Sequence, residues 1–115
     1  MSISPVLPRV VEAVSRATGV PAAEIMGRKR RAEVAEARQI AYALARWTAG
    51  RASSFPALGR FFGRDHTTIM QGVQAVTRRA LVDEAFRQRL HGIERDVTAP
   101  WIAAVPFRTS RRSLP

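Results

Sequence analysis

Hydrophobic residues recur along this chain every three to four positions, and no stretch of any length alternates residue by residue. This spacing is typical of amphipathic helices and not of strands. We therefore expect an all-α protein, a compact bundle of about six helices. The helices are predicted at 5–18, in a short segment of 20–27, at 32–49, in a short segment after Ser53 or Ser54, at 66–80 and at 83–97.

Local signals mark the ends of several of these helices. Gly19 and Gly50 follow the first and third helices as C-terminal stops. Ser53 or Ser54 precedes Pro56, which suits the first turn of a helix because its missing N–H costs little there. Asp65 is predicted to cap the fifth helix by accepting a hydrogen bond from the next N–H groups.

The fifth helix has two unlike faces, because each helical residue advances about 100° around the axis. Its buried stripe is predicted to consist of Ile69, Val73 and Val76. The opposite side carries a row of polar side chains: Thr67, Gln71, Gln74 and Arg78. A short apolar helix and a tight turn at Gly63 come just before, so the two helices have the form of a helix-turn-helix, whose second helix enters the major groove of DNA. A plain solvated helix is the alternative, but it would more typically carry Lys and Glu on that face.

Charge strengthens the case for a polyanionic partner. The 115 residues form one domain with a net charge of +10, and residues 27–79 alone hold eleven basic and three acidic side chains. Arginine suits phosphate and guanine through its forked donors, although a basic surface can also serve solubility alone. There is no cysteine, no apolar run long enough to span a membrane and no signal-peptide pattern at the start. We therefore expect a cytoplasmic, nucleoid-associated protein.

Catalysis finds little support in the sequence. The neighbours Asp65 and His66 have no nucleophile or metal partner, and the only other histidine, His91, has no metal-ligand spacing with His66. We expect no enzyme activity, no metal and no cofactor. Trp47 and Phe61 fall on apolar helix faces and are expected to be core residues, not stacking platforms for single-stranded nucleic acid.

Two segments of the chain resemble a known family. The stretch "GRFFGRDHTTIMQGVQAV" is similar to the signature of the C-terminal DNA-binding domain of DnaA, the bacterial replication initiator, whose motif is close to F-G-G-[RK]-D-H-T-T-V. The upstream "RKRRAEVAEARQIAYALAR" resembles the basic loop and following helix of that domain. The likeness covers roughly residues 6–97. It implies a Trp-repressor-like helical fold that binds duplex DNA at an asymmetric A·T-rich box of the TTATNCACA type.

The pattern and the resemblance together give a set of candidate DNA contacts. Arg30 is expected in the minor groove, where narrow A·T tracts attract arginine. The other expected base contacts are Pro56, Arg64, Asp65, His66, Thr67, Met70 and Gln71. Contacts to the DNA backbone, which set register, are expected from Lys29, Arg31, Arg38, Gln39, Arg46, Thr68, Gln74 and Arg78.

The chain also departs from the family pattern. One glycine stands where the family commonly has two, Gln71 replaces a frequent histidine, Gln74 and Ala75 replace a common Arg-Lys pair, and the acids Glu33 and Glu36 lie at positions that are often neutral or basic. The chain contains no G-x-x-x-x-G-K-[ST] motif, so we expect a regulator of transcription or replication initiation that occupies a DNA site without ATP-driven remodelling.

Residues 1–98 are predicted to form the DNA-binding domain, and residues 99–115 a Pro-rich, basic tail that docks loosely through Trp101 and Phe107 or does not dock. The expected partners are double-stranded DNA and other replication or transcription proteins; a membrane and a small-molecule substrate are not expected. An asymmetric box is compatible with a monomer. A helical adaptor that docks another protein and binds DNA only weakly is the alternative function.

Overall fold

The computed structural model describes residues 5–104, with side chains described for residues 5–50 and 53–98. This part of the chain forms six α-helices and one short 3-10 helix, η1, and contains no strand. The all-α prediction is confirmed. The helices are α1 (Val6–Thr18), α2 (Ala22–Ile25), α3 (Ala32–Thr48), η1 (Gly50–Ser53), α4 (Phe55–Phe62), α5 (His66–Val82) and α6 (Glu84–Ala104).

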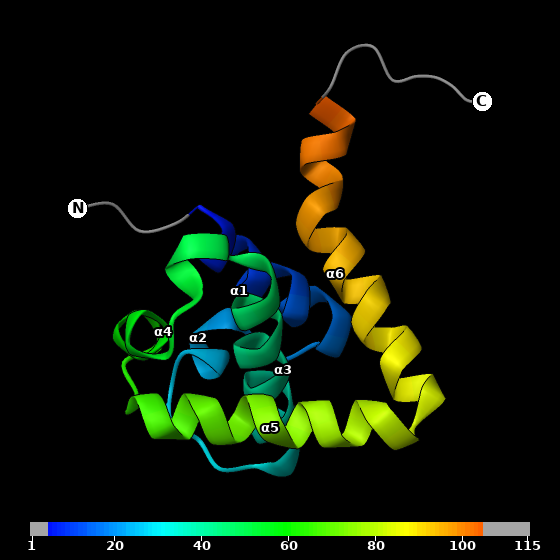
Figure 1. Cartoon of the computed structure of the whole chain (residues 1–115). Helices are drawn as coiled ribbons and strands as arrows, with labels where there is room; N and C mark the ends of the chain where they lie inside the picture. Colours follow the sequence, from blue (N-terminus) through cyan, green and yellow to red (C-terminus); the bar gives the residue numbers. More distant parts are fainter. Residues whose placement is uncertain (1–4, 105–115) are drawn as a thin grey trace.

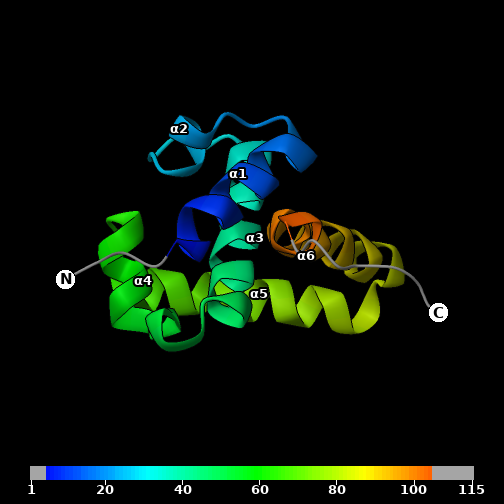
Figure 2. The ribbon, with the colours of Figure 1, turned by 90° about the horizontal axis from the view of Figure 1, so that it is seen from above.

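Helix α3 is the centre of the bundle. It lies between α1 and α2 on one side and α5 on the other, and α5 crosses it at a steep angle (Figures 1 and 2). Helix α4 lies beside the N-terminal end of α5, and α6 rises from its C-terminal end (Figure 1). This arrangement leaves the N-terminal tip of α5 at the edge of the molecule, close to the loop that joins α2 to α3.

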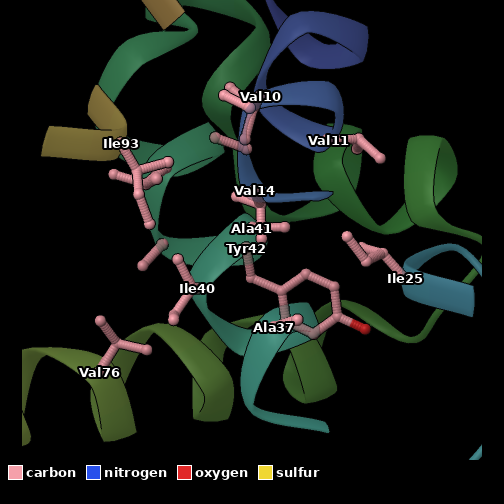
Figure 3. Close-up of a cluster of buried hydrophobic side chains, with 14 of the residues drawn as sticks. Val10, Val11, Val14, Ile25, Ala37, Ile40, Ala41, Tyr42, Val76 and Ile93 are labelled. Carbon is pink, nitrogen blue, oxygen red and sulfur yellow. The ribbon is translucent and has the colours of Figure 1, made fainter. Parts of the chain in front are cut away.

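The core gathers around α3 because that helix is apolar on several sides. Val34, Ala37, Ile40, Ala41 and Leu44 are fully buried, as the sequence predicted. Side chains from α1, α2, α5 and α6 point at them, including those labelled in Figure 3: Val10, Val14, Ile25, Val76 and Ile93. Burying aliphatic side chains on this scale is the main source of stability in a small domain.

The local stop and start signals act as predicted. Gly19 and Gly63 adopt left-handed backbone conformations, with φ of 78° and 68°, at the C-terminal ends of α1 and α4. The Ser54 hydroxyl caps α4 by accepting a hydrogen bond from the backbone N–H of Ala57, and Pro56 lies in the first turn. Of the two serines proposed for this cap, the structure selects Ser54.

Two predictions about the packing need correction. Trp47 was expected in the core, but 44% of it is exposed, because it lies at an open hollow between α3, α5 and α6. Phe61 is only partly buried against the core. Helix α6 is also longer than predicted, running through the predicted domain boundary at residues 98 and 99 to Ala104. The Trp101 side chain, Phe107 and the basic end of the tail lie outside the described residues.

None of the helices in the described part of the chain combines the length and the apolar character that a membrane crossing requires.

Candidate nucleic-acid interface

The tip of α5 is built by its N-terminal cap. The Asp65 carboxylate accepts hydrogen bonds from the backbone N–H and the hydroxyl of Thr67, at 2.8 and 2.7 Å. These two bonds, the backbone one first, lower the pKa of the Asp65 carboxyl below its ordinary value. The cap predicted from the sequence is therefore confirmed. It fixes the start of α5 after the turn at Gly63, where Asp65, His66 and Thr67 are exposed.

The polar row of α5 lies on the surface as predicted. Thr67, Gln71, Gln74 and Arg78 are all exposed, whereas Ile69, Val73 and Val76 are buried. His66 lies at the tip with 57% of its side chain exposed, and its Nδ1 is 3.5 Å from Asp65 Oδ1. Pro56 is exposed on α4, and Met70 and Thr68 are half-buried at the edge of the row. One end and one side of α5 thus present hydroxyl, amide, imidazole and guanidinium groups to solvent.

The basic loop (Gly27–Arg31) is held from inside by Arg38. The Arg38 guanidinium donates hydrogen bonds to the backbone carbonyls of Glu24, Ile25 and Lys29, at 2.9, 3.1 and 3.0 Å. Only 6% of the residue is exposed, and its burial lowers the pKa of the guanidinium. Arg38 therefore shapes the loop from below the surface, and the phosphate contact expected of it stays a prediction.

Two further arginines join the basic loop to the turn before α5. Arg28 donates a hydrogen bond to the Gly63 carbonyl at 3.0 Å, and Arg64 donates one to the Gly27 carbonyl at 3.3 Å. We call this pair the loop–turn bonds. They connect segments 35 and 37 positions apart in sequence and hold the loop beside the N-terminal half of α5 (Figure 1). No pattern in the sequence predicted the role of Arg28, and Arg64 was predicted only as a base contact.

Within the basic loop, Arg30 differs from its neighbours. Lys29 and Arg31 both pair with Glu24, at 3.1 and 3.3 Å, and these contacts lower the pKa of the Glu24 carboxyl. Arg30 is exposed and makes no hydrogen bond or ion pair with any residue in the described part of the chain. The neighbouring ion pairs and the loop–turn bonds therefore leave Arg30 as the loop cation that is available to a ligand.

A hollow of about 180 Å³ lies on the surface between α3 and the N-terminal half of α5. It brings together several side chains for which the sequence predicts DNA contacts. Its lining consists of Ala35, Arg38, Gln39, Tyr42, Arg64, Thr68, Gln71 and Gly72. Arg46 lies elsewhere: it donates to the Ser53 carbonyl at 2.9 Å and stacks on the Phe55 ring, 4.3 Å from the centroid. Arg46 therefore also supports the start of α4.

The two acids that depart from the family pattern have basic partners. Glu36 accepts from Arg79 of α5 at 2.6 Å and lies 3.9 Å from Arg89 of α6. Glu33 pairs with Arg31 at 3.5 Å. Their charges are therefore partly balanced within the protein. Across the residues with described side chains, no group of three or more histidines and carboxylates is arranged to hold a metal ion.

Comparison of the chain with known protein families identifies the family to which it belongs. The family described as the bacterial DnaA protein helix-turn-helix matches residues 7–76, which include the basic loop, α4, the turn and the polar row of α5 as far as Gln74. The chain belongs to this family. The resemblance inferred from the D-H-T-T and R-Q motifs is confirmed, and so is the helix-turn-helix predicted for α4 and α5.

The relatives are replication initiators. The chain is 32% identical over 88 residues to the chromosomal replication initiator protein DnaA of Oenococcus oeni, covering 76% of this chain and 19% of the relative. It is 34% identical over 70 residues to DnaA of Neisseria meningitidis serogroup C, covering 60% of this chain and 13% of the relative. DnaA of Deinococcus deserti is 34% identical over 92 residues, with 74% and 20% covered. This chain thus spans a fifth or less of the length of these relatives.

Proposed function

We propose that this protein binds double-stranded DNA sequence-specifically, with the tip of α5 in the major groove and Arg30 in the adjacent minor groove. The proposal rests above all on one observation: the loop–turn bonds hold an unpaired arginine beside an exposed, capped polar helix tip. A helix-turn-helix places the N-terminal residues of its second helix at base edges, and an arginine suits the strong negative potential of a narrow minor groove.

The tip residues carry groups that suit base edges. The Thr67 hydroxyl already donates to Asp65, so this exposed residue offers DNA its methyl group and the acceptor capacity of its oxygen. A Thr methyl can contact thymine, a carboxylate can accept from cytosine N4, and a Gln such as Gln71 can pair with adenine. His66 adds ring nitrogens at the extreme tip. Gln39, Gln74 and Arg78 flank this group as exposed donors for phosphates.

The site we propose is an A·T-rich box like that bound by the initiator, and the role is regulation of transcription or replication initiation. Membership of the DnaA helix-turn-helix family supports both. Occupying such a site requires no nucleotide hydrolysis. The net charge of +10 supports a phosphate contribution, which should weaken by nearly one log unit in affinity per tenfold rise in salt for each phosphate neutralised.

Selection from a random duplex pool at fixed salt tests the site. We expect a core similar to TTATNCACA. Arg30→Ala and His66→Ala should each weaken binding to the selected duplex by about 1–3 kcal/mol and leave a scrambled duplex little changed. Arg78→Ala should weaken both duplexes alike and reduce the salt slope by about one. The matched control is Arg16→Ala, which removes an exposed charge from α1 on the other side of the bundle. Equal losses on both duplexes for Arg30 and His66 would refute the base contacts.

A second candidate function, an adaptor for another protein, is favoured by a separate surface. Trp47, Leu81 and Val82 are 44%, 74% and 87% exposed, and Trp47 and Leu81 line a mainly apolar hollow of about 250 Å³ between α3, α5 and α6. Exposed apolar surface of this kind is typical of interaction sites. Trp47→Ser with Leu81→Ser would abolish partner binding and retain DNA binding. If these changes instead abolish DNA binding in a folded protein, the surface is not a separate site.

A further inference from the structure

Gly72 lies in the middle of α5, directly against the ring of Tyr42 on α3. A Cβ atom at position 72 would lie 2.8 Å from Tyr42 Cδ2 and 3.4 Å from Gln39 Cγ. Carbon atoms in contact prefer separations of about 3.5–4.0 Å. Glycine usually weakens a helix interior, and here its lack of a side chain permits the close approach of α5 to α3. Any other residue would force the two helices apart or displace the ring.

The Tyr42 ring has little freedom to move. It is 2% exposed, and it packs edge-on against Phe62, with the ring centroids 4.8 Å apart. Phe62 is the last residue of α4, and it is itself packed edge-on against Phe61 at 4.9 Å. One ring on α3 therefore contacts both helices of the helix-turn-helix: α4 through Phe62 and α5 through Gly72.

A neighbouring residue of α3 also holds the basic loop in place. Arg38, one helical turn before Tyr42, holds the loop through the three carbonyls of Glu24, Ile25 and Lys29. Because Arg38 ties the basic loop to α3, the position of α5 relative to α3 also sets the distance between α5 and Arg30. Tyr42 itself lies in the interior, as Figure 3 shows, and its hydroxyl forms no hydrogen bond within the described part of the chain.

We propose that the contact between Tyr42 and Gly72 is a positioning device that sets the spacing between the α5 tip and Arg30, and thereby the sequence selectivity of the protein. This inference rests on the function proposed above. Hydrogen bonds to base edges need defined distances and angles, whereas attraction to phosphates tolerates small shifts. A displaced α5 should therefore lose discrimination between DNA sequences before it loses affinity for DNA.

Gly72→Ala tests the proposal, and Gly92→Ala is its matched control. Both changes add one methyl group to a helix interior, but a Cβ at position 92 meets nothing closer than the Arg95 guanidinium at 4.0 Å. Tyr42→Phe keeps the ring and removes the unpaired hydroxyl. Tyr42→Met removes the ring and supplies a flexible chain that can move away from an added methyl group. The double variant Gly72→Ala with Tyr42→Met completes a cycle that measures coupling.

The readout is the ratio of Kd for scrambled duplex to Kd for the selected duplex. Gly72→Ala should lower this ratio by about tenfold, comparable to one lost base-edge contact, while the scrambled Kd and its salt slope stay unchanged. Tyr42→Met alone should also lower the ratio, and the double variant should recover most of it. Gly92→Ala and Tyr42→Phe should match the unmodified protein. A helical thermal transition for each variant shows that it is folded.

Amide chemical shifts of the DNA-free protein separate this inference from the proposed function. Gly72→Ala should shift the resonances of residues 65–68, and Gly92→Ala should not. If Gly72→Ala changes neither these shifts nor the ratio, if Gly92→Ala lowers the ratio equally, or if the double variant recovers nothing, the positioning role is refuted. If the unmodified protein prefers no duplex but Gly72→Ala still shifts residues 65–68, the proposed function fails and the spacing role of the contact stands.

Discussion

Arg38 provides the strongest test of how the basic loop is built. Arg38→Met would keep an unbranched side chain in the interior and remove the guanidinium that donates to the carbonyls of Glu24, Ile25 and Lys29. We expect the protein to lose stability and the loop to separate from α3. We expect Arg38 to act on DNA through the loop, because only 6% of the residue is exposed.

The size of the effect follows from the three bonds. A hydrogen bond that involves a charged group contributes about 1.5–3 kcal/mol, and an unsatisfied buried carbonyl costs about 1–3 kcal/mol. The bond to the Ile25 carbonyl is buried, whereas the other two are partly buried, so water can replace them in part. We therefore expect the free energy of unfolding to fall by about 3–5 kcal/mol, a large share of the total for a small domain.

Urea denaturation followed by circular dichroism measures this change, and amide hydrogen exchange locates it. Exchange should accelerate in residues 24–31 well before it does in α5. The control is Arg16→Met on the exposed face of α1, which should change stability by no more than about 0.5 kcal/mol. The reasoning is refuted if Arg38→Met leaves the unfolding curve unchanged and instead weakens binding to every duplex with a flatter salt slope. That result would restore Arg38 as a phosphate contact.

Three further predictions follow from the caps and from the surface. Ser54→Ala should lower the free energy of unfolding by about 1 kcal/mol in urea titrations, because it removes the cap of α4; an unchanged midpoint would contradict the cap. The pKa of Asp65 is lower in the folded protein, so its stabilising contribution is present above the unfolded value near 4 and is lost as pH falls through the folded value. Asp65→Asn should therefore flatten the acid side of the stability–pH curve, and a curve identical to that of the unmodified protein would oppose this. Trp47→Ala should cost about 2 kcal/mol, less than the roughly 3–5 kcal/mol of a fully buried aromatic residue; a loss in the upper range by thermal melting would show that the ring is buried in solution.

The helices, their caps and the two faces of α5 could be predicted from the amino-acid sequence. These features depend on residues no more than four positions apart. Asp65 caps at Thr67 and Ser54 caps at Ala57. The helical period puts Ile69 and Val73 on one face of α5 and Gln71 on the other. Periodicity and capping are local, so they can be inferred from one chain alone. The motif around Asp65 also carried enough information to predict the family, which the comparison confirmed.

The contacts of the arginines and the exposure of Trp47 depend on how the helices pack, and they could not be predicted from the sequence. Arg28 and Arg64 bond to carbonyls more than thirty positions away, and Glu36 meets Arg79 across 43 positions. No local pattern encodes such pairs, because they depend on how α3 and α5 cross. Periodicity likewise placed Trp47 on the core side of α3 but could not show that the covering helices leave it exposed. Gly72 has no side chain to add to a pattern, so its contact with the Tyr42 ring is visible only in the packing of α5 on α3.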